Sequence, residues 1–367
     1  MGGKSYSKGM IDRSEKYSKT CEAFSRLSDD QLSSLITKAQ PLQSGIGGKS
    51  VLITIEDTPI FVKKVPLTDL ELQPQNVKNT ANLFGLPLCC QYGIGSPGFG
   101  AWRELLAHTM TTDWVLGGQC LNFPLLYHWR ALPSPKQEPM NMDEWGSLDA
   151  FVKFWDGAVS VRERINAING ATSQIYLFLE YVPQNLYDWL SARLSAGKAE
   201  AEAESALQFA LEKLEATNQF MIEAGLLHFD AHFKNILTDG ELIYFTDFGL
   251  ALSSQFDLSC QEIDFFEVHK NYDCCSTAIS LVHCIIASQF GGKDWSTVLQ
   301  EYVNGGRGEL SSAMAAVVRQ NAAIALAMND FYQKLKHNSK STPYPDAELE
   351  KLLTSANYRF ISHRLCP

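Results

Sequence analysis

Two acidic side chains and an amide lie close together in the second half of the chain. The segment HFDAHFKN at 228–235 contains Asp230 and Asn235, and Asp247 follows within TDFG at 246–249. A carboxylate can orient a hydroxyl group and accept its proton, and carboxylate and amide oxygens are ligands that Mg²⁺ prefers. Transfer of a phosphoryl group to a hydroxyl needs both functions in one place. Asp230, Asn235 and Asp247 therefore include the residue types that such a reaction needs, at a short spacing.

These residues belong to two motifs. His228, Asp230 and Asn235 fit the pattern H-x-D-x-x-x-x-N, and the DFG motif begins 17 residues after Asp230. Between the motifs, residues 236–245 fit a strand, a turn and a second strand. Both motifs, in this order and at this spacing, resemble those of the protein-kinase superfamily, and the resemblance runs from about residue 40 to 290. It implies a phosphotransferase that uses ATP and Mg²⁺ as cofactors, with Asp230 as the base and with Asn235 and Asp247 as metal ligands.

The resemblance also implies a glycine-rich loop before the first clear strand. Residues 44–50 read SGIGGKS, in which Gly45 and Gly47 match the start of G-x-G-x-x-G and Ser50 replaces the last glycine. Glycines in such a loop let backbone N–H groups approach the phosphates. The P-loop pattern G-x-x-x-x-G-K-[ST] is excluded because Gln43 occupies the position of its first glycine. We therefore expect Gly45 and Gly47 to bind the nucleotide.

A lysine and a glutamate are expected to complete the phosphate-binding part. Lys63 in IFVKKV resembles the lysine of the family motif V-A-I-K, although Phe61 stands where the family has alanine. Lys64 is the alternative, because the alternation of side chains along a strand does not show which lysine points inward. Glu104, in the helical segment WRELLAH, resembles the glutamate that holds this lysine in the family.

The strand IYLFLEYV at 175–182 resembles the hinge of the family. The resemblance implies that backbone groups of Glu180 and Val182 pair with adenine, and that Leu179 lies beside the adenine site. Asp273 resembles a buried helix aspartate that braces the catalytic loop. The alternative for Asp273 is an ordinary acidic residue at a helix N-terminus.

Several positions depart from the family pattern. Phe229 replaces the arginine of H-R-D, which implies that phosphorylation of the activation segment does not control the protein. His232 is similar to the histidine of aminoglycoside- and choline-kinase-like enzymes, and only 26 residues separate Asp247 from Asp273. Lys234 either supplies positive charge to the γ-phosphate or faces solvent.

Three functions remain open at this point. An atypical Ser/Thr protein kinase is favoured by the hinge and by the V-x-K-K strand. A small-molecule O-phosphotransferase of the aminoglycoside- or choline-kinase type is favoured by His232 and the short activation segment. A catalytically dead pseudokinase that acts as a scaffold is disfavoured because Asp230, Asn235 and Asp247 are intact. The expected partner is thus a protein with a Ser/Thr hydroxyl or a small hydroxyl-bearing molecule.

The elements that must position these residues predict an α+β fold. Residues 51–67 fit a β-hairpin with its turn at Asp57-Thr58-Pro59. The other expected elements are a helix at 102–116, a strand at 123–132, a helix at 147–168, a strand at 175–182, a helix at 203–227 and the hairpin at 236–245. Strands with one helix, followed mainly by helices, indicate a bilobal, kinase-like fold with a small β-rich N-lobe and a larger helical C-lobe.

This order suggests domain boundaries. We expect a partly helical N-terminal extension at 1–38, an N-lobe at 39–182 with insertions at 66–100 and 133–173, and a helical C-lobe at 183–367. Ser28 and Gln31 form a capping-box pattern within the extension.

The amino-acid composition indicates which ligands and which cellular compartment to expect. The net charge of −10 disfavours binding to nucleic-acid phosphates. Nine cysteines without a C-x-x-C spacing disfavour a structural zinc site and, with no secretory leader, suggest reduced thiols in the cytoplasm. His283 interrupts the longest apolar run, so we expect no membrane span.

Overall fold

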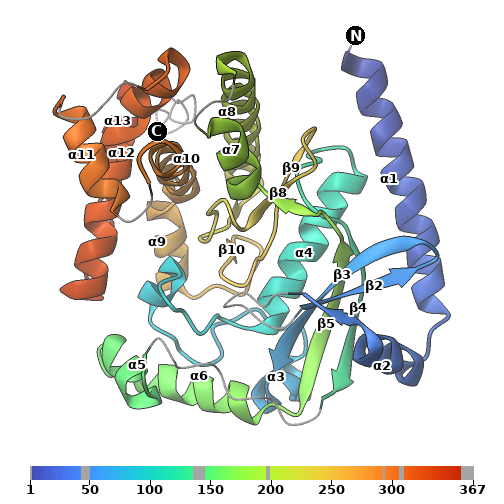
Figure 1. Ribbon diagram of the computed structural model, residues 1–367. Helices are drawn as coiled ribbons and strands as arrows, with labels where there is room; N and C mark the ends of the chain where they lie inside the picture. The colour runs from blue at the N-terminus through green and yellow to red at the C-terminus, as the bar shows by residue number, and fades with distance from the viewer. Residues whose placement is uncertain are drawn as a thin grey trace, which may run out of the picture.

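The computed structural model describes residues 2–42, 50–134, 145–195, 199–291, 294–305 and 310–356, with side chains from residue 11 onward. The chain folds into a mixed α+β structure, as the sequence predicts. A five-stranded sheet lies at one end of the molecule, and most helices from the second half of the chain lie at the other (Figure 1).

The sheet is antiparallel, with Lys63 on its central strand. It consists of β1 (Gln40–Pro41), β2 (Ser50–Ile55), β3 (Thr58–Leu67), β4 (Leu126–Pro133) and β5 (Ser173–Glu180), in the order β1-β2-β3-β5-β4. The turn predicted at 57–59 starts one residue too late, and Thr58 and Pro59 belong to β3. Glu56 and Asp57 form it, with φ values of 45° and 65°, because a two-residue turn with positive φ matches the twist of the strands.

Three helices pack around the sheet. They are α1 (Gly2–Ser25), α2 (Asp29–Lys38) and α4 (Ala101–Leu116), and α1 runs along the outer edge (Figure 1). The N-terminal extension is therefore more helical than predicted. The capping box of α2 is confirmed, since Ser28 and Gln31 exchange both hydrogen bonds. Phe24 anchors α1 by packing on Phe178 of the sheet, with ring centroids 4.6 Å apart.

The two inserted segments contain α3 (Asp69–Leu72), η1 (Pro74–Asn76), η2 (Leu88–Tyr92), α5 (Leu148–Phe154) and α6 (Val159–Gly170). The single helix predicted at 147–168 is wrong, because Asp156 and Gly157 adopt positive φ and break it into α5 and α6. The segments share one apolar cluster, in which Cys90 and Phe99 of the first pack against Trp155 of the second.

Glu71 links this cluster to α4. Its carboxylate accepts hydrogen bonds from Ala101 N at 2.8 Å and from Arg164 Nη1 at 3.0 Å. The first bond satisfies one of the free N–H groups at the start of α4, where Gly100 offers no side chain to do so.

The helical part contains α7 (Leu186–Leu194), α8 (Glu200–Glu223), α9 (Cys260–Val268), α10 (Tyr272–Phe290), α11 (Trp295–Val303), α12 (Ser312–His337) and α13 (Asp346–Ser355). Its short strands are β6 (Gln184–Asn185), β7 (Leu226–Leu227), β8 (Ile236–Thr238), β9 (Ile243–Phe245) and β10 (Leu252–Ser253). The β8–β9 hairpin is where the sequence predicts it. The helix predicted at 203–227 ends early, because Gly225 has a φ of 74° and residues 226–227 pair with β10.

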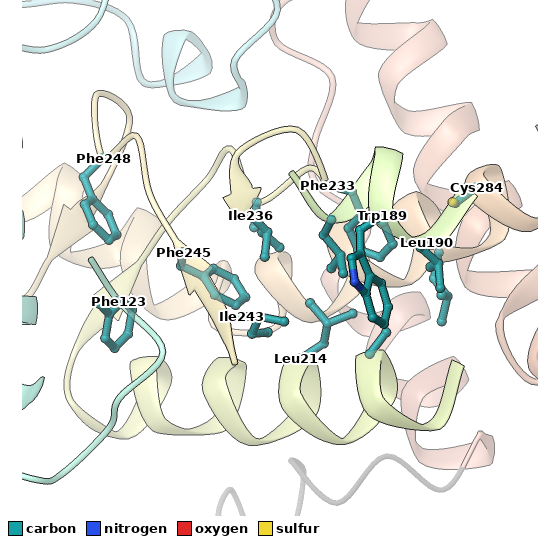
Figure 2. Close-up of a cluster of buried hydrophobic side chains, with 14 of the residues drawn as sticks. Phe123, Trp189, Leu190, Leu214, Phe233, Ile236, Ile243, Phe245, Phe248 and Cys284 are labelled. Carbon is teal, nitrogen blue, oxygen red and sulfur yellow. The ribbon is translucent and has the colours of Figure 1, made fainter. Parts of the chain in front are cut away.

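A buried apolar layer supports the chain that carries both motifs. Figure 2 shows Phe233, Ile236, Ile243 and Phe245 above α8, with Leu214 of that helix beneath them. These side chains are almost inaccessible to solvent. Segment 228–248 is therefore supported by a tightly packed layer. This packing fixes the backbone from which its other side chains point away from the layer.

Helix α10 is long and apolar enough to cross a membrane by length and composition, and 61% of its most apolar 18-residue window is buried within the protein. It packs against α12 and α7 as a core helix does. The absence of a membrane span remains a prediction.

Candidate functional site

Lys63 joins three elements that are distant in sequence. Its Nζ lies 2.5 Å from Glu104 Oε1 on α4 and 2.6 Å from Asp247 Oδ1, which follows β9. Lys63 shares a face of β3 with Phe61, which packs toward α4, whereas Lys64 is half-buried on the other face. Of the two lysines, the structure thus brings Lys63 together with the predicted glutamate and aspartate.

The charges in this cluster depend on one another. Burial lowers the pKa of Lys63, but the negative charges of Asp247 and Glu104 outweigh it and raise the pKa above its usual value. Burial raises the pKa of Asp247, and Lys63 more than reverses this, so that the carboxyl stays ionised. The pKa of Glu104 is raised by its burial, although Lys63 opposes the change.

Asp247 has an uncommon backbone conformation, with a φ of 66°. The next residue, Phe248, is fully buried and contacts the rings of His108 and His228, at centroid distances of 4.9 and 5.0 Å. Figure 2 shows Phe248 beside Phe123. The buried ring and the Lys63 ion pair together keep Asp247 in a conformation that is otherwise costly.

Asp230 and Asn235 form a second cluster next to the first. Asn235 Nδ2 donates to Asp230 Oδ2 at 2.9 Å and to the Asp230 backbone carbonyl at 3.2 Å. Burial and the nearby charge of Asp247 raise the pKa of Asp230 to about 8. His232 Nε2 lies 3.7 Å from Asp230 Oδ1. The amide of Asn235 orients the Asp230 carboxylate through its nitrogen, which directs the amide oxygen elsewhere.

Asp273 braces the backbone that precedes Asp230. Its two carboxylate oxygens accept from His228 N at 2.6 Å and from Phe229 N at 2.9 Å. Asp273 is fully buried at the start of α10, so it is more than a surface charge at a helix end. Phe229, which has a φ of 61°, packs on the rings of Phe265 and Tyr272.

The residues predicted for adenine binding lie at the end of β5. Leu179 and Val182 are buried, and Glu180 N donates to Leu125 O at 2.8 Å. The Glu180 carboxylate accepts from Arg13 of α1 at 2.6 Å, and the same guanidinium donates to two backbone carbonyls at 121 and 123. Arg13 has no motif around it, so the sequence offered no signal for this contact.

Some predicted residues lie apart from the clusters or outside the part of the chain that the structure describes. Gly45 and Gly47 fall outside the described residues. Lys234 is exposed, and its Nζ lies 6.0 Å from the centroid of the Tyr187 ring. This position agrees better with a solvent-facing lysine than with a partner of Asp230.

The connection between β3 and α4 borders the site, a position that no sequence motif indicated. A Cβ atom on Gly93 would lie 3.3 Å from Asp230 Oδ1 and 3.2 Å from Leu250 Cδ1. Gln91 donates to the carbonyl oxygen of Leu250, and Gly98 lies close to Gly249 O. The segment 91–98 therefore runs beside the DFG motif and forms a wall next to Asp230.

The predicted metal ligands, Asp247 and Asn235, lie in the two neighbouring clusters, and Asp247 Oδ1 already accepts from Lys63 Nζ at 2.6 Å. Among the described residues, no three His, Cys, Asp or Glu side chains form a group that could hold a metal by themselves. The eight cysteines in this part of the chain are free. Mg²⁺ usually keeps several waters and binds one or two carboxylates besides the phosphates of a substrate, so it does not need a group of three protein ligands.

Comparison with known proteins gives no relatives from which to assign a role. No protein-family model matches the chain, and no curated protein matches it. A function for the chain must therefore be inferred from the geometry and chemistry of the site.

Proposed function

We propose that the chain is a Mg²⁺- and ATP-dependent phosphotransferase that transfers the γ-phosphoryl group to a hydroxyl. The observation that carries the proposal is the position of Lys63, bonded at once to Glu104 and Asp247, next to the hydrogen-bonded pair of Asp230 and Asn235. A phosphate-binding lysine, its glutamate, a metal-binding aspartate and a base are the parts that protein kinases use.

The proposal also assigns the parts of the fold to the lobes of a kinase. The sheet and α4 correspond to the small N-lobe of a kinase-like fold, at 39–182, the helices α1 and α2 to the N-terminal extension, and the helical part at 183–367 to the C-lobe. The backbone of Glu180 and Val182 would then connect the lobes and pair with adenine. Asp273 supports this assignment, because it accepts from two backbone N–H groups directly before Asp230.

In the proposed reaction, Asp230 in its ionised form orients the acceptor hydroxyl and takes its proton as the new P–O bond forms. The bond between the γ-phosphorus and the β,γ-bridging oxygen breaks, and ADP leaves. Lys63 holds the α- and β-phosphates, and Glu104 keeps its ammonium group in place. Mg²⁺, when bound by Asp247 and Asn235, neutralises charge on the phosphates.

Two classes of acceptor are proposed for the phosphoryl group. The sequence favours a Ser/Thr hydroxyl of a protein. The wall formed by residues 91–98 favours the second candidate, a small hydroxyl-bearing molecule. Gln91 already occupies the carbonyl of Leu250, and Gly93 lies against Asp230, which leaves less room for an extended polypeptide.

The proposal is tested by assaying transfer of labelled phosphate from ATP to the protein itself, to generic proteins and to small alcohols. Asp247→Ala should reduce turnover by several orders of magnitude, since it removes a metal ligand and the partner of Lys63. Asp230→Ala should abolish turnover but retain ATP binding. Glu241→Ala, an exposed position in the β8–β9 turn, is the control. Near-normal activity of Asp247→Ala would refute the proposal, and Mg-ATP binding without any turnover would indicate a scaffold.

A further inference from the structure

Helix α4 carries two adjacent charged residues that face different partners. Glu104 points to Lys63, and Arg103 points to α9, where its Nη2 lies 2.6 Å from Glu262 Oε1. The side chains of Arg103 and Glu262 are only 2% and 3% exposed. Arg103 Nε also donates to Thr80 O at 2.6 Å. One helix is therefore tied both to the sheet and to the helical part of the protein.

Glu262 is itself fixed before it meets the arginine. It is the third residue of α9 and forms the capping box with Ser259, so that its Oε2 accepts from Ser259 N at 3.0 Å and from Ser259 Oγ at 2.9 Å. Its other oxygen is thereby directed at Arg103. Such a preorganised carboxylate loses little further freedom when it binds a guanidinium group.

A second link runs parallel to the first. Thr80 N and Oγ1 donate to Asp257 Oδ2 at 3.2 and 2.8 Å, and Asp257 N donates back to Thr80 Oγ1 at 2.8 Å. The rings of Phe99 and Phe256 lie 5.2 and 5.5 Å from the Arg103 guanidinium carbon. The chain before α4 and the chain before α9 thus enclose the ion pair.

Movement of α4 away from the site would break this pair. It would leave a buried arginine and a buried glutamate without each other, which is strongly unfavourable. Because Arg103 and Glu104 are neighbours on one rigid helix, the tie to α9 also fixes the position of Glu104. In protein kinases the lysine–glutamate pair must form for activity, and the position of this helix controls it.

The residue directly before Asp230 is not one that could bind a phosphorylated activation segment. Phe229 occupies the position that would face a phosphorylated activation segment, and it lies among the rings of Phe265, His269 and Tyr272. An aromatic ring in that cluster offers no positive charge to a phosphate. The support for α4 comes instead from Glu262.

We propose that Arg103 is a positioning residue that, through Glu262, holds Glu104 against Lys63 without phosphorylation, so that the enzyme is active as synthesised. This inference rests on the proposed phosphotransferase function and names its mode of regulation.

The test is a double-mutant cycle on the full-length protein. Arg103→Met keeps the side-chain stem between the two rings and removes the charge, and it should lower kcat about 10- to 100-fold, as should Glu104→Gln. If Arg103 acts through Glu104, the double variant should fall no more than about threefold below Glu104→Gln alone. Arg162→Met, which breaks a more exposed ion pair with Asp149 on the inserted helices, is the matched control and should stay near wild type. Losses that multiply in the double variant would overturn the inference.

Phosphatase treatment and hydrogen exchange test the proposal independently of the double-mutant cycle. Wild-type protein treated with a phosphatase should retain its activity within about twofold, and a large loss would overturn the proposal. Hydrogen exchange should rise in residues 101–116 of Arg103→Met but not in α12, whereas unchanged exchange would show that Arg103 does not hold the helix. Arg103→Lys, which keeps the charge, should restore part of both properties. If even the wild type transfers no phosphate to any acceptor, the proposed function fails, and exchange still decides whether Arg103 fixes α4.

Discussion

The two halves of the candidate site are held in different ways. On the proposed nucleotide side, short ion pairs join Lys63 to Glu104 and Asp247; Lys63 and Glu104 are buried, and Asp247 is partly exposed. On the proposed acceptor side, Asp230 is only partly buried and is oriented by the neutral amide of Asn235. Charge pairing makes the first half rigid, and its members are expected to be intolerant of substitution. The second half depends on its wall and on the backbone bracing beneath it.

The sharpest way to test the nucleotide side compares two neighbouring lysines. Lys63→Met should lower kcat/KM by at least about 10²- to 10³-fold, because it removes the phosphate contact and leaves the carboxylates of Glu104 and Asp247 without their cation. Lys64→Met should stay within about threefold of wild type, since Lys64 lies on the other face of β3. Steady-state assays with labelled ATP measure both. Equal losses in the two variants would contradict the assignment of Lys63.

The contact of Arg13 with Glu180, at the proposed hinge, should give a smaller effect on the same side. Arg13→Ala removes the cation that binds Glu180 and two carbonyls beside the proposed adenine contact. We expect KM for ATP to rise about 5- to 10-fold while kcat changes little, because only nucleotide binding is affected. Arg26→Ala, which removes an exposed pair with Glu22 on the same helix, is the control. A fall in kcat at constant KM would count against this role.

Gly93→Ala tests the acceptor side of the site. The new methyl group would lie 3.3 Å from Asp230 Oδ1, so kcat should fall about 3- to 10-fold while KM for ATP stays unchanged. Gly85→Ala is a matched control, because Gly85 has a similar φ of 61° but no atom within 4 Å of the added carbon. Both variants have the same kind of backbone strain, and the difference between them reports the contacts of the added carbon with Asp230 and Leu250. Identical kinetics in the two variants would show that the wall does not act on Asp230.

The smallest effect concerns the support beneath the acceptor side. His269 is buried, its ring lies 5.7 Å from that of Phe229, and Tyr92 Oη lies 2.7 Å from its Nε2. Burial lowers the pKa of His269 to about 4. The unfolded chain therefore binds a proton below about pH 6.5 that the folded state resists, and stability is lost as the pH falls from 6.5 toward 4.

This single group should cost about 1 kcal/mol of unfolding free energy between pH 7.5 and 5.5. Urea unfolding at the two pH values measures it, and His269→Gln should show a smaller difference than wild type. His269→Gln should remove only part of the pH dependence of the unfolding free energy, because burial also lowers the pKa of His108 and His228, to about 3 and about 4. An unchanged pH dependence in His269→Gln would place His269 in a solvated environment.

Much of the local structure follows from short-range rules that the sequence displays. The capping box of Ser28 and Gln31 and the β8–β9 hairpin form where the pattern predicts them, since each depends on neighbouring residues. The errors occur where a local backbone choice overrides periodicity. Asp156 and Gly157 break an expected helix with positive φ, and Glu56 shifts a turn by one residue. Periodicity alone does not report which residue takes the left-handed conformation.

The choice between Lys63 and Lys64 required the tertiary structure for another reason. Both faces of β3 are covered, one by α4 and the other by the larger core, so neither face is marked as polar by the sequence. Only the register with α4 shows that Lys63 meets Glu104. The wall at Gly93 and the ties of Arg13 and Arg103 are likewise contacts between residues far apart in the chain.

By itself, the sequence determined which chemical groups are present and in what order: the carboxylates of Asp230 and Asp247, the amide of Asn235 and the candidate lysines. Tertiary structure decided which of them meet and what surrounds them. The physical reason is that a residue type and its spacing define local geometry and chemical capability, whereas charge pairing and burial depend on segments brought together only by packing of the whole chain.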